Sequence, residues 1–498
     1  MTTLDPQFPG SGSLLIPAPV GTLAIERFEP LIGTPAYHRL LERFARGREL
    51  LGDHVMWHVN STARGGGVAE MLYSLLAYGR GAGIAQRWLA VAGTPAFFAV
   101  TKRIHNHLHG AFGDGLPLDD EAREVYSSFT RAAGEELANR ISPGDVVLLH
   151  DPQTAGMIPA LQGLGVPVAW RSHVGIDHAT PVTRHAWEFL RGYVSQADAY
   201  IFSRRQHVWD QLDAAKTALI APSIDAFSAK NQDLADDRVT AILAAAGLQG
   251  EPGTGDPVFV RLDGTVGRVE RRARVVETRH LAPDDPVVLQ VSRWDRLKDP
   301  LGVIDGFVRH VLGPTGAHLV VAGPSVDEVA DDPEGGEVLQ EAMACYSALP
   351  QLAREHVHLV TLPMTDLEEN AAIVNALQRR AQVVVQKSIA EGFGLTVAEA
   401  MWKARPVVAS RIGGIQDQIV DGRTGRLVDP GDLAAYGSAV SDLLADPPRA
   451  VEMGERARDQ VRRGFLGTRS FLQYIALYER LVTGRGVPAE VSSPPGYV

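Results

Sequence analysis

The chain lacks the features that mark secreted, membrane-spanning and nucleic-acid-binding proteins. It has 498 residues and one cysteine, Cys345, so no disulfide can form within it, which is typical of a reducing compartment. No run of about 18 apolar residues could cross a bilayer. The N-terminus has neither a cationic start nor a long apolar run, so we expect no signal peptide. The net charge of −11 argues against general binding to nucleic acid or a membrane surface, because both need a basic face. We therefore expect a cytoplasmic protein.

Short apolar segments alternate with longer amphipathic ones along most of the chain. This alternation predicts the α/β class, with parallel sheets covered by helices on both faces. The length exceeds what one hydrophobic core supports, and the alternation forms two series, so we expect two doubly wound Rossmann-like domains. The expected division is an N-terminal domain over 1–222, a connecting region over 223–285, a C-terminal domain over 286–469, and a helix with a tail over 470–498, the helix returning toward the N-terminal domain.

The most informative stretch runs from Val383 to Met401. It begins as a buried β-branched strand, continues through a polar loop with two glycines, and enters a helix near Leu395. A helix that begins at a glycine loop presents free backbone N–H groups to an anion or to hydroxyls. Two carboxylates lie here, Glu391 in the loop and Glu399 one turn into the helix. We interpret them as contacts to two parts of one ligand, the alternative being an ordinary strand–helix turn.

A pair of cations follows the first strand of the second series. Arg293 and Lys298 lie five positions apart, and both side chains suit phosphate groups. Positive charge at this place could stabilise a departing diphosphate. The alternative is that both are ordinary surface cations.

Polar residues also end the strands of the first series, where open parallel sheets bind ligands. Asn60, Arg171 and His173 fall at such ends, the histidine being a candidate for a purely structural role. Asp151 ends another strand, and its alternative role is to cap the following helix. Three glycines, including Gly66 and Gly67, follow the first strand; they could admit a ligand close to the backbone or form only a tight turn.

No group of side chains has the spacing of a metal site. The segment from His105 to His109 carries three histidines at alternate positions, and we interpret it as a loop, with a metal site as the alternative.

The motif of Glu391, seven residues and Glu399, with GFGL between them, resembles the donor-site signature of retaining GT-B glycosyltransferases of family 4. The segments HVNSTARGGGVAEML, HDPQTAGMIPAL, WRSHVGID, PSIDAFSAKN and QVSRWDRLKDP are similar to the branch that synthesises or phosphorolyses trehalose. The resemblance covers roughly residues 30 to 480. It implies the GT-B fold, in which two Rossmann-like domains face a cleft.

The resemblance also implies roles for single residues. Glu391 would hold sugar hydroxyls of the donor and Glu399 its ribose, while Arg293 and Lys298 would contact the donor phosphates. His173 would lie against the donor sugar, its backbone carbonyl facing the reacting centre. The remaining implied donor-binding residues are Gly66, Gly67, Gly392, Phe393, Gly394 and Leu395. The implied acceptor-binding residues are Asp151, His173, Asn60 and Arg171.

The function that we expect is retaining transfer of glucose from a nucleoside diphosphate glucose, UDP- or ADP-glucose, to glucose or a related polyol. The product would carry an α,α-1,1 link, as in trehalose. Two alternatives stay open: a phosphate-dependent trehalose phosphorylase, and a sugar-nucleotide-binding regulator without turnover. We expect no required cofactor and no essential metal, and a homodimer is compatible with the sequence. The base of the nucleotide and the identity of the acceptor stay open.

Overall fold

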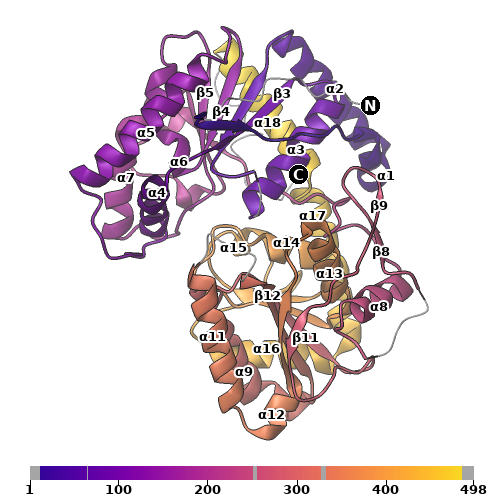
Figure 1. Ribbon diagram of the computed structural model, residues 1–498. Helices are drawn as coiled ribbons and strands as arrows, with labels where there is room; N and C mark the ends of the chain where they lie inside the picture. Colours follow the sequence, from indigo (N-terminus) through magenta and orange to yellow (C-terminus); the bar gives the residue numbers. More distant parts are fainter. Residues whose placement is uncertain (1–11, 64–65, 251–254, 327–332, 485–498) are drawn as a thin grey trace. The chain divides into compact units, whose positions relative to one another are not determined.

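The computed structural model describes residues 12–63, 66–250, 255–326 and 333–484. Two compact units make up the chain (Figure 1). Among the described residues, the first combines those up to Pro222 with Gly467 and the residues after it, and the second contains residues 223–466. The region 223–285 therefore belongs to the second unit, and the last helix belongs to the first. No helix among the described residues is long and apolar enough to cross a membrane.

The first unit is built on a seven-stranded sheet in the order β1-β3-β2-β4-β5-β6-β7. Six strands are parallel, and the short β1 pairs antiparallel with β3 at the edge. The strands are β1 (Leu15–Pro17), β2 (Met56–Asn60), β3 (Gln86–Val91), β4 (Val146–His150), β5 (Val168–Ser172), β6 (Ala199–Phe202) and β7 (Thr217–Leu219). Every residue of β2, β4, β5 and β6 is buried, because helices cover both faces.

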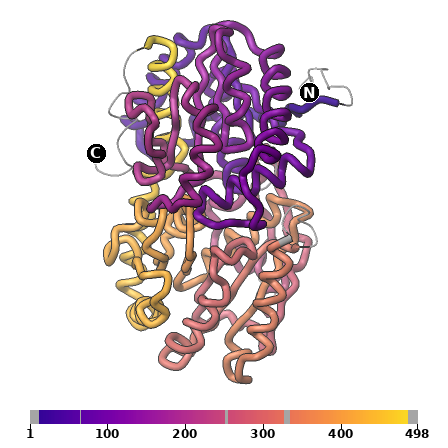
Figure 2. Tube along the Cα trace, turned by 90° about the vertical axis from the view of Figure 1, so that its left-hand side faces the viewer, coloured from indigo at the N-terminus to yellow at the C-terminus, as the bar shows by residue number. Residues whose placement is uncertain are grey.

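Two groups of helices cover this sheet, one on each face (Figures 1 and 2). On one face lie α4 (Pro95–Leu108), α5 (Asp120–Ala138), α6 (Pro152–Ala155) and α7 (Pro181–Val194). On the other lie α2 (Thr34–Leu51), α3 (Gly67–Gly81) and α18 (Gly467–Thr483), with α1 (Glu29–Ile32) preceding α2. The ring of Phe471 on α18 lies 5.2 Å from that of Phe44 on α2, so the end of the chain completes this layer.

The second unit has a seven-stranded sheet in the order β10-β13-β12-β11-β14-β15-β16. Again six strands are parallel, and β10 pairs antiparallel with β13. The strands are β10 (Arg274–Val276), β11 (Val287–Val291), β12 (His318–Pro324), β13 (Val357–Leu362), β14 (Val383–Gln386), β15 (Val407–Ser410) and β16 (Arg426–Val428). The described part of the unit also holds a separate two-stranded ribbon, β8 (Val258–Val260) and β9 (Val266–Arg268).

The helices of the second unit follow the strands in the usual βα alternation. They are α8 (Asp236–Ala245), α9 (Pro300–His310), α10 (Leu312–Thr315), α11 (Pro333–Ala348), α12 (Gln351–His356), α13 (Leu367–Arg380), α14 (Leu395–Trp402), α15 (Ile415–Gln418), α16 (Leu433–Ala445) and α17 (Pro447–Gly464). The predicted α/β class with two doubly wound parallel sheets is thus confirmed.

In each sheet the strand order reverses at one point, between β2 and β4 in the first unit and between β11 and β14 in the second. At such a point the loops that leave the two strands run to opposite faces of the sheet, which opens a crevice beyond their carboxyl ends. Ligands of open α/β sheets bind at this position. The two reversal points therefore indicate where a site should be sought in each unit.

The histidine-rich segment was predicted wrongly as a loop. His105 and His107 lie in α4, which Thr94 caps by accepting a hydrogen bond from the N–H of Phe97. The apolar residues Phe97, Val100, Ile104 and Leu108 repeat at helical spacing and are buried, so burial of this stripe holds the segment in a helix. Among the described residues, no group of three His, Cys, Asp or Glu side chains is arranged to hold a metal ion.

Candidate functional site

An ion pair connects the two loops at the reversal point of the second unit. Lys298, in the loop after β11, places its Nζ 2.5 Å from Oε2 of Glu391, in the loop after β14. The Ser388 hydroxyl lies 3.4 Å from the same carboxylate oxygen. Both charged side chains are mostly buried, with exposed fractions of 16% and 12%. The structure thus brings together two of the residues that the sequence proposed for donor binding.

A second ion pair, the inner pair, adjoins the first because Asp299 directly follows Lys298 in the chain; it was not foreseen from the sequence. The ammonium group of Lys387, at the end of β14, pairs with the carboxylate of Asp299. Lys387 is only 2% exposed. Asp299 has a left-handed backbone with φ of 51° and caps α9 by accepting a hydrogen bond from the N–H of Gly302 at 3.0 Å. The signal in the sequence was a lysine directly after a buried strand, which does not reveal its partner 88 residues earlier.

Backbone and side-chain hydrogen bonds also fix the positions of the loops after β11 and β14. The N–H of Ile389 donates to the carbonyl of Leu297 at 2.7 Å. The amide of Gln290, on β11, donates to the carbonyl of Lys298 at 2.8 Å. Together with the two ion pairs, these contacts fix the position of Lys298 relative to Glu391.

The loop that carries Gly392, Phe393 and Gly394 is fixed by the turn after β15. Gly394 has a φ of 81° and precedes the first residue of α14, Leu395. The side chain of Gln418 donates to the Phe393 carbonyl at 2.6 Å. A Cβ at Gly413 would lie 1.8 Å from the carbonyl oxygen of Glu391, so only glycine fits there. The sequence showed the glycine pair Gly413-Gly414 but not what it touches.

Glu399 lies on α14 and is 5% exposed. Its Oε1 lies 3.7 Å from Nζ of Lys230, on the segment that opens the second unit. One turn further along, Lys403 donates to the Oδ1 of Asn231 at 2.9 Å and to the carbonyl of Glu399 at 3.1 Å. Burial holds the pKa of Lys403 well below its ordinary value, partly offset by Glu399. Lys230, Asn231 and Lys403 were not identified from the sequence, because their spacing shows no motif.

Arg293 occupies the same loop as Lys298 but is more exposed. Its side chain is 55% exposed, and its guanidinium pairs with the carboxylate of Asp295 at 2.9 Å. Asp295 in turn accepts a hydrogen bond from the N–H of Leu297, so Arg293 is attached to the turn that carries Lys298. The guanidinium therefore stands at the outer part of the loop and Lys298 at the inner part.

In the first unit, Asp151 and His173 meet at the ends of β4 and β5. Oδ1 of Asp151 accepts a hydrogen bond from the His173 N–H at 2.7 Å. The alternative role of Asp151 as a helix cap is not observed, because its side chain makes no hydrogen bond to the N-terminus of α6. Its φ of 64° is rare for a residue with a side chain and indicates a constrained backbone. Burial raises the pKa of Asp151 to about 7, against the opposing effects of the His173 N–H and Arg171.

The other predicted residues of the first unit have mainly local contacts. Arg171 is buried, donates to the carbonyl of Ile220 at 3.0 Å and lies over the ring of Tyr474. Burial lowers its pKa to about 9, in spite of Asp151. Asn60 donates to the carbonyl of Thr62 at 3.0 Å and shapes the loop after β2.

The glycine loop after β2 leads into α3. Gly66 has a φ of 80°, and α3 begins at Gly67. Among the described residues other than its chain neighbour, no heavy atom lies within 4 Å of the position that a Cβ of Gly66 would occupy. Arg64 and Gly65 of this loop lie outside the described residues.

Comparison with known proteins agrees with this arrangement. Residues 58–209 match the family model "Trehalose synthase, N-terminal domain", and residues 276–460 match "Glycosyl transferases group 1". The trehalose synthase of Rubrobacter xylanophilus is 36% identical over 93% of this chain and 98% of its own length. The trehalose phosphorylase of Pleurotus pulmonarius is 27% identical over 84% of this chain and 57% of its own length.

A solved structure from E. coli, named for trehalose-6-phosphate and bound with UDP-2-fluoro glucose, has the same fold. Its TM-score is 0.63 at 11% identity, covering 87% of this chain and 100% of that one. The two sheets thus form a GT-B fold. The near-complete match to the Rubrobacter protein establishes that the chain belongs to the trehalose synthase family and is a hexosyltransferase.

Proposed function

We propose that the protein transfers glucose from a nucleoside diphosphate glucose to glucose or a related polyol, with retention of the anomeric configuration. The product would be an α,α-1,1-linked disaccharide such as trehalose. The observation that carries the proposal is the Lys298–Glu391 pair at the strand-order reversal of the second unit. A cation that could bind phosphate lies directly beside a carboxylate that could accept hydrogen bonds from sugar hydroxyls, which supports the proposal.

The nucleotide would bind along the loops of the second unit. Lys298 and the more exposed Arg293 supply positive charge for the diphosphate, one as a point charge and the other as a planar fork. The N-terminus of α14 would add a partial positive charge. Glu399, buried on the same helix, would accept hydrogen bonds from the ribose hydroxyls.

Catalysis would come from stabilising charge on the leaving group. The bond between the anomeric carbon and the diphosphate oxygen breaks, and its electron pair stays on the phosphate oxygen. The acceptor oxygen bonds to the anomeric carbon on the same face, and its proton passes to that phosphate oxygen. Lys298 and Arg293 stabilise the negative charge as it develops, which is the kind of contribution that preorganised groups make in many enzymes.

The first unit would bind the acceptor and align one group of the reaction. Asp151 fixes the backbone at His173 through the 2.7 Å hydrogen bond, which orients the carbonyl and the ring of that residue. The constrained backbone of Asp151 fits such a role, because strained residues gather at ligand-binding sites. Asn60 and the backbone at Gly66 belong to the neighbouring strand end.

Phosphorolysis is the second candidate, since the same cations could bind inorganic phosphate. The similarity to the Pleurotus phosphorylase supports it, but at lower identity and over a smaller share of that protein than the similarity to the Rubrobacter synthase. Synthesis is therefore the proposed direction.

A ligand panel with the purified protein tests the proposal. Thermal-shift measurements with UDP, ADP, GDP and their glucose esters should show stabilisation by at least one nucleotide, and that sugar nucleotide with glucose should then yield a disaccharide. Trehalose with phosphate should yield little glucose 1-phosphate. Stabilisation without turnover of any donor would instead indicate a binding regulator, and efficient phosphorolysis without nucleotide would indicate the phosphorylase.

A further inference from the structure

Three histidines form a continuous hydrogen-bonded row across the first unit. Nδ1 of His58 lies 3.1 Å from Nε2 of His150, and Nδ1 of His150 lies 3.1 Å from Nε2 of His173. Both ring pairs are nearly parallel, with centroids 5.3 and 5.4 Å apart. His58 and His150 are buried in adjacent strands, and neither has a role in the proposed chemistry so far.

The register of the strands explains why the row exists. His58 on β2 is opposite Leu148 on β4, two residues before His150. His150 is opposite Arg171 on β5, two residues before His173. Because side chains two positions apart project from the same face of a strand, all three rings lie on one face of the sheet and advance toward its carboxyl edge.

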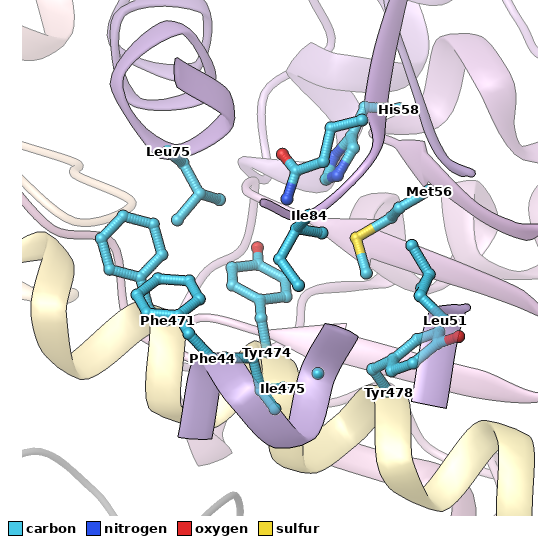
Figure 3. Close-up of a pocket in the computed structure, with 12 residues that line it drawn as sticks. Phe44, Leu51, Met56, His58, Leu75, Ile84, Phe471, Tyr474, Ile475 and Tyr478 are labelled. Carbon is cyan, nitrogen blue, oxygen red and sulfur yellow. The ribbon is translucent and has the colours of Figure 1, made fainter. Parts of the chain in front are cut away.

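The inner end of the row faces a cavity of about 30 Å³ beneath the sheet (Figure 3). Residues of β2 and β3 line it together with residues of α2, α3 and α18. Four polar atoms of its lining have no hydrogen-bond partner among the described residues: His58 Nε2, Gln86 Oε1, Tyr474 OH and Tyr478 OH. A cavity of this volume with several polar partners can hold a water molecule. Such a water could donate a hydrogen bond to His58 Nε2 or accept one from it.

Each contact between two ring nitrogens holds one proton, which couples the tautomers along the row. A neutral imidazole carries its proton on only one nitrogen. If His58 carries it on Nδ1, it donates to His150, which must then carry its own on Nδ1 and donate to His173. If His58 carries it on Nε2, the whole row reverses. Burial and the charge of Arg171 keep the pKa of all three well below its ordinary value, so the neutral forms apply near pH 7.

We infer that His58 and His150 are positioning residues that fix the tautomer of His173 from the cavity behind the sheet. Nε2 of His173 is occupied by His150, so Nδ1 is the nitrogen left for a ligand. Depending on the state of the row, this nitrogen presents either a proton or a lone pair. That His173 meets a sugar hydroxyl rests on the proposed function, whereas the coupling within the row does not.

Nitrogen NMR of the full-length protein with ¹⁵N-labelled histidine rings tests the coupling directly. Substituting each histidine in turn assigns its signals. We expect one common tautomer in the wild type, with the proton on the same nitrogen, Nδ1 or Nε2, in all three rings. A mixed pattern, such as Nδ1–H at His150 with Nε2–H at His173, would overturn the inference.

Variants at the cavity end of the histidine row test whether the tautomer of His58 determines that of His173. His58→Phe keeps a planar ring but removes both nitrogens, and it should shift the tautomer equilibrium of His173, two strands away. Gln86→Leu is a milder change at the cavity and should shift it in the same assay. His107→Phe replaces another buried histidine of the same unit outside the row and serves as the control. An unchanged His173 signal in both His58→Phe and Gln86→Leu would overturn the inference.

Turnover gives a separate readout. If the proposed transfer occurs, His58→Phe should lower kcat about tenfold or more while the KM for the nucleotide sugar stays near its original value. Failure of the wild type to transfer glucose would contradict the proposed function and leave the NMR test intact. Normal kcat in a variant whose His173 tautomer has shifted would overturn the positioning role alone.

Discussion

Lys298 and Glu391 lie 93 positions apart in the chain, yet their Nζ and Oε2 atoms are 2.5 Å apart in the second unit. The pair spans the point where the strand order reverses, because Lys298 lies in the loop after β11 and Glu391 in the loop after β14. A cation and a carboxylate are therefore held together at this point. The proposed sugar diphosphate would need both: positive charge for its phosphates and acceptors for its hydroxyls. The predictions below concern this pair and the contacts that hold it.

Removing either cation should slow the transfer. Lys298→Ala or Arg293→Ala should lower kcat by about 10²–10³, the range typical of removing one preorganised electrostatic group. The more buried Lys298 should show the larger loss, because charge interactions are stronger away from solvent. Steady-state kinetics measures the effect, and binding of neutral glucose serves as the control. Near-normal turnover in both variants would show that Arg293 and Lys298 are ordinary surface cations without a role in the transfer.

Substitutions of Glu391 and Glu399 should have different effects, because the two side chains are expected to bind different parts of the donor. Glu399→Ala should weaken binding of the free nucleotide, because a ribose hydroxyl loses its acceptor. Glu391→Ala should reduce turnover more than nucleotide binding, because its expected partner is the sugar. Calorimetric titration with the free nucleotide distinguishes them. If the nucleotide binds Glu391→Ala far more weakly than Glu399→Ala, the assignment is reversed.

The inner ion pair should matter for both stability and turnover. Lys387→Met leaves the Asp299 carboxylate without its partner, and breaking a buried pair from one side typically costs about 3–5 kcal/mol. Asp299→Asn should keep the cap of α9, because the amide oxygen can still accept from the Gly302 N–H, but it strands the buried Lys387 charge. Both variants should lower kcat by displacing Lys298.

Arg296→Gln is the matched control for the inner pair. It removes an exposed cation, in the same turn as Lys298, that pairs with three glutamates on α11. Solvent screens exposed ion pairs, which contribute little to stability, so the unfolding midpoint and kcat should hardly change. Equal effects of Lys387→Met and Arg296→Gln on unfolding midpoints and kcat would show that the inner pair has no special role.

Much of the fold follows from patterns that the sequence displays. The β-branched runs and the glycines after them predicted the parallel strands and the turns into helices, since both signals are local. The edge strands β1 and β10 were not predicted, because a strand of three residues shows no periodicity and its pairing depends on a strand far along the chain. The helix α4 was not predicted because the three histidines at its C-terminal end alternate along the chain, a pattern that obscures the helical spacing of its apolar residues.

The sites were predicted only as far as side chains lie at strand ends. Lys298, Glu391 and Asp151 could be placed in this way, since parallel strands bring their carboxyl ends together. The buried contacts around these residues could not be predicted, because they depend on register and burial. Examples are the contacts of Asp299 with Lys387, of Asn231 with Lys403 and of His58 with His150. A buried lysine or histidine carries no mark in the sequence that separates it from an exposed one.

Stability should fall as the pH drops from 6.5 toward 5. Burial lowers the pKa of His58 to about 3 and those of His150 and His173 well below 6.5, so the unfolded chain takes up three protons that the folded chain does not. Asp151 acts in the opposite direction, because its raised pKa of about 7 lets the folded form bind a proton first. For these four groups alone, three protons less one leave two, or roughly 3 kcal/mol per pH unit. Burial also lowers the pKa of His107, His207 and His318, which steepens the fall in the same direction.

Urea unfolding at pH 7, 6 and 5 measures this dependence. His58→Gln should reduce the slope by up to about 1.4 kcal/mol per pH unit, because one of the three protons is lost. His38→Gln, at an exposed position, is the control. A His58→Gln slope equal to that of the wild type would show that His58 does not remain neutral in the folded protein.

The stereochemistry of the product tests the central claim most directly. The purified enzyme is incubated with UDP-glucose or ADP-glucose and with glucose labelled with ¹³C at C1, and the product is examined by NMR. Retaining transfer predicts a non-reducing disaccharide in which both anomeric carbons are α, with one nucleoside diphosphate released for each link formed. A β configuration at the transferred glucose, or release of free glucose as the sole sugar product, would contradict it.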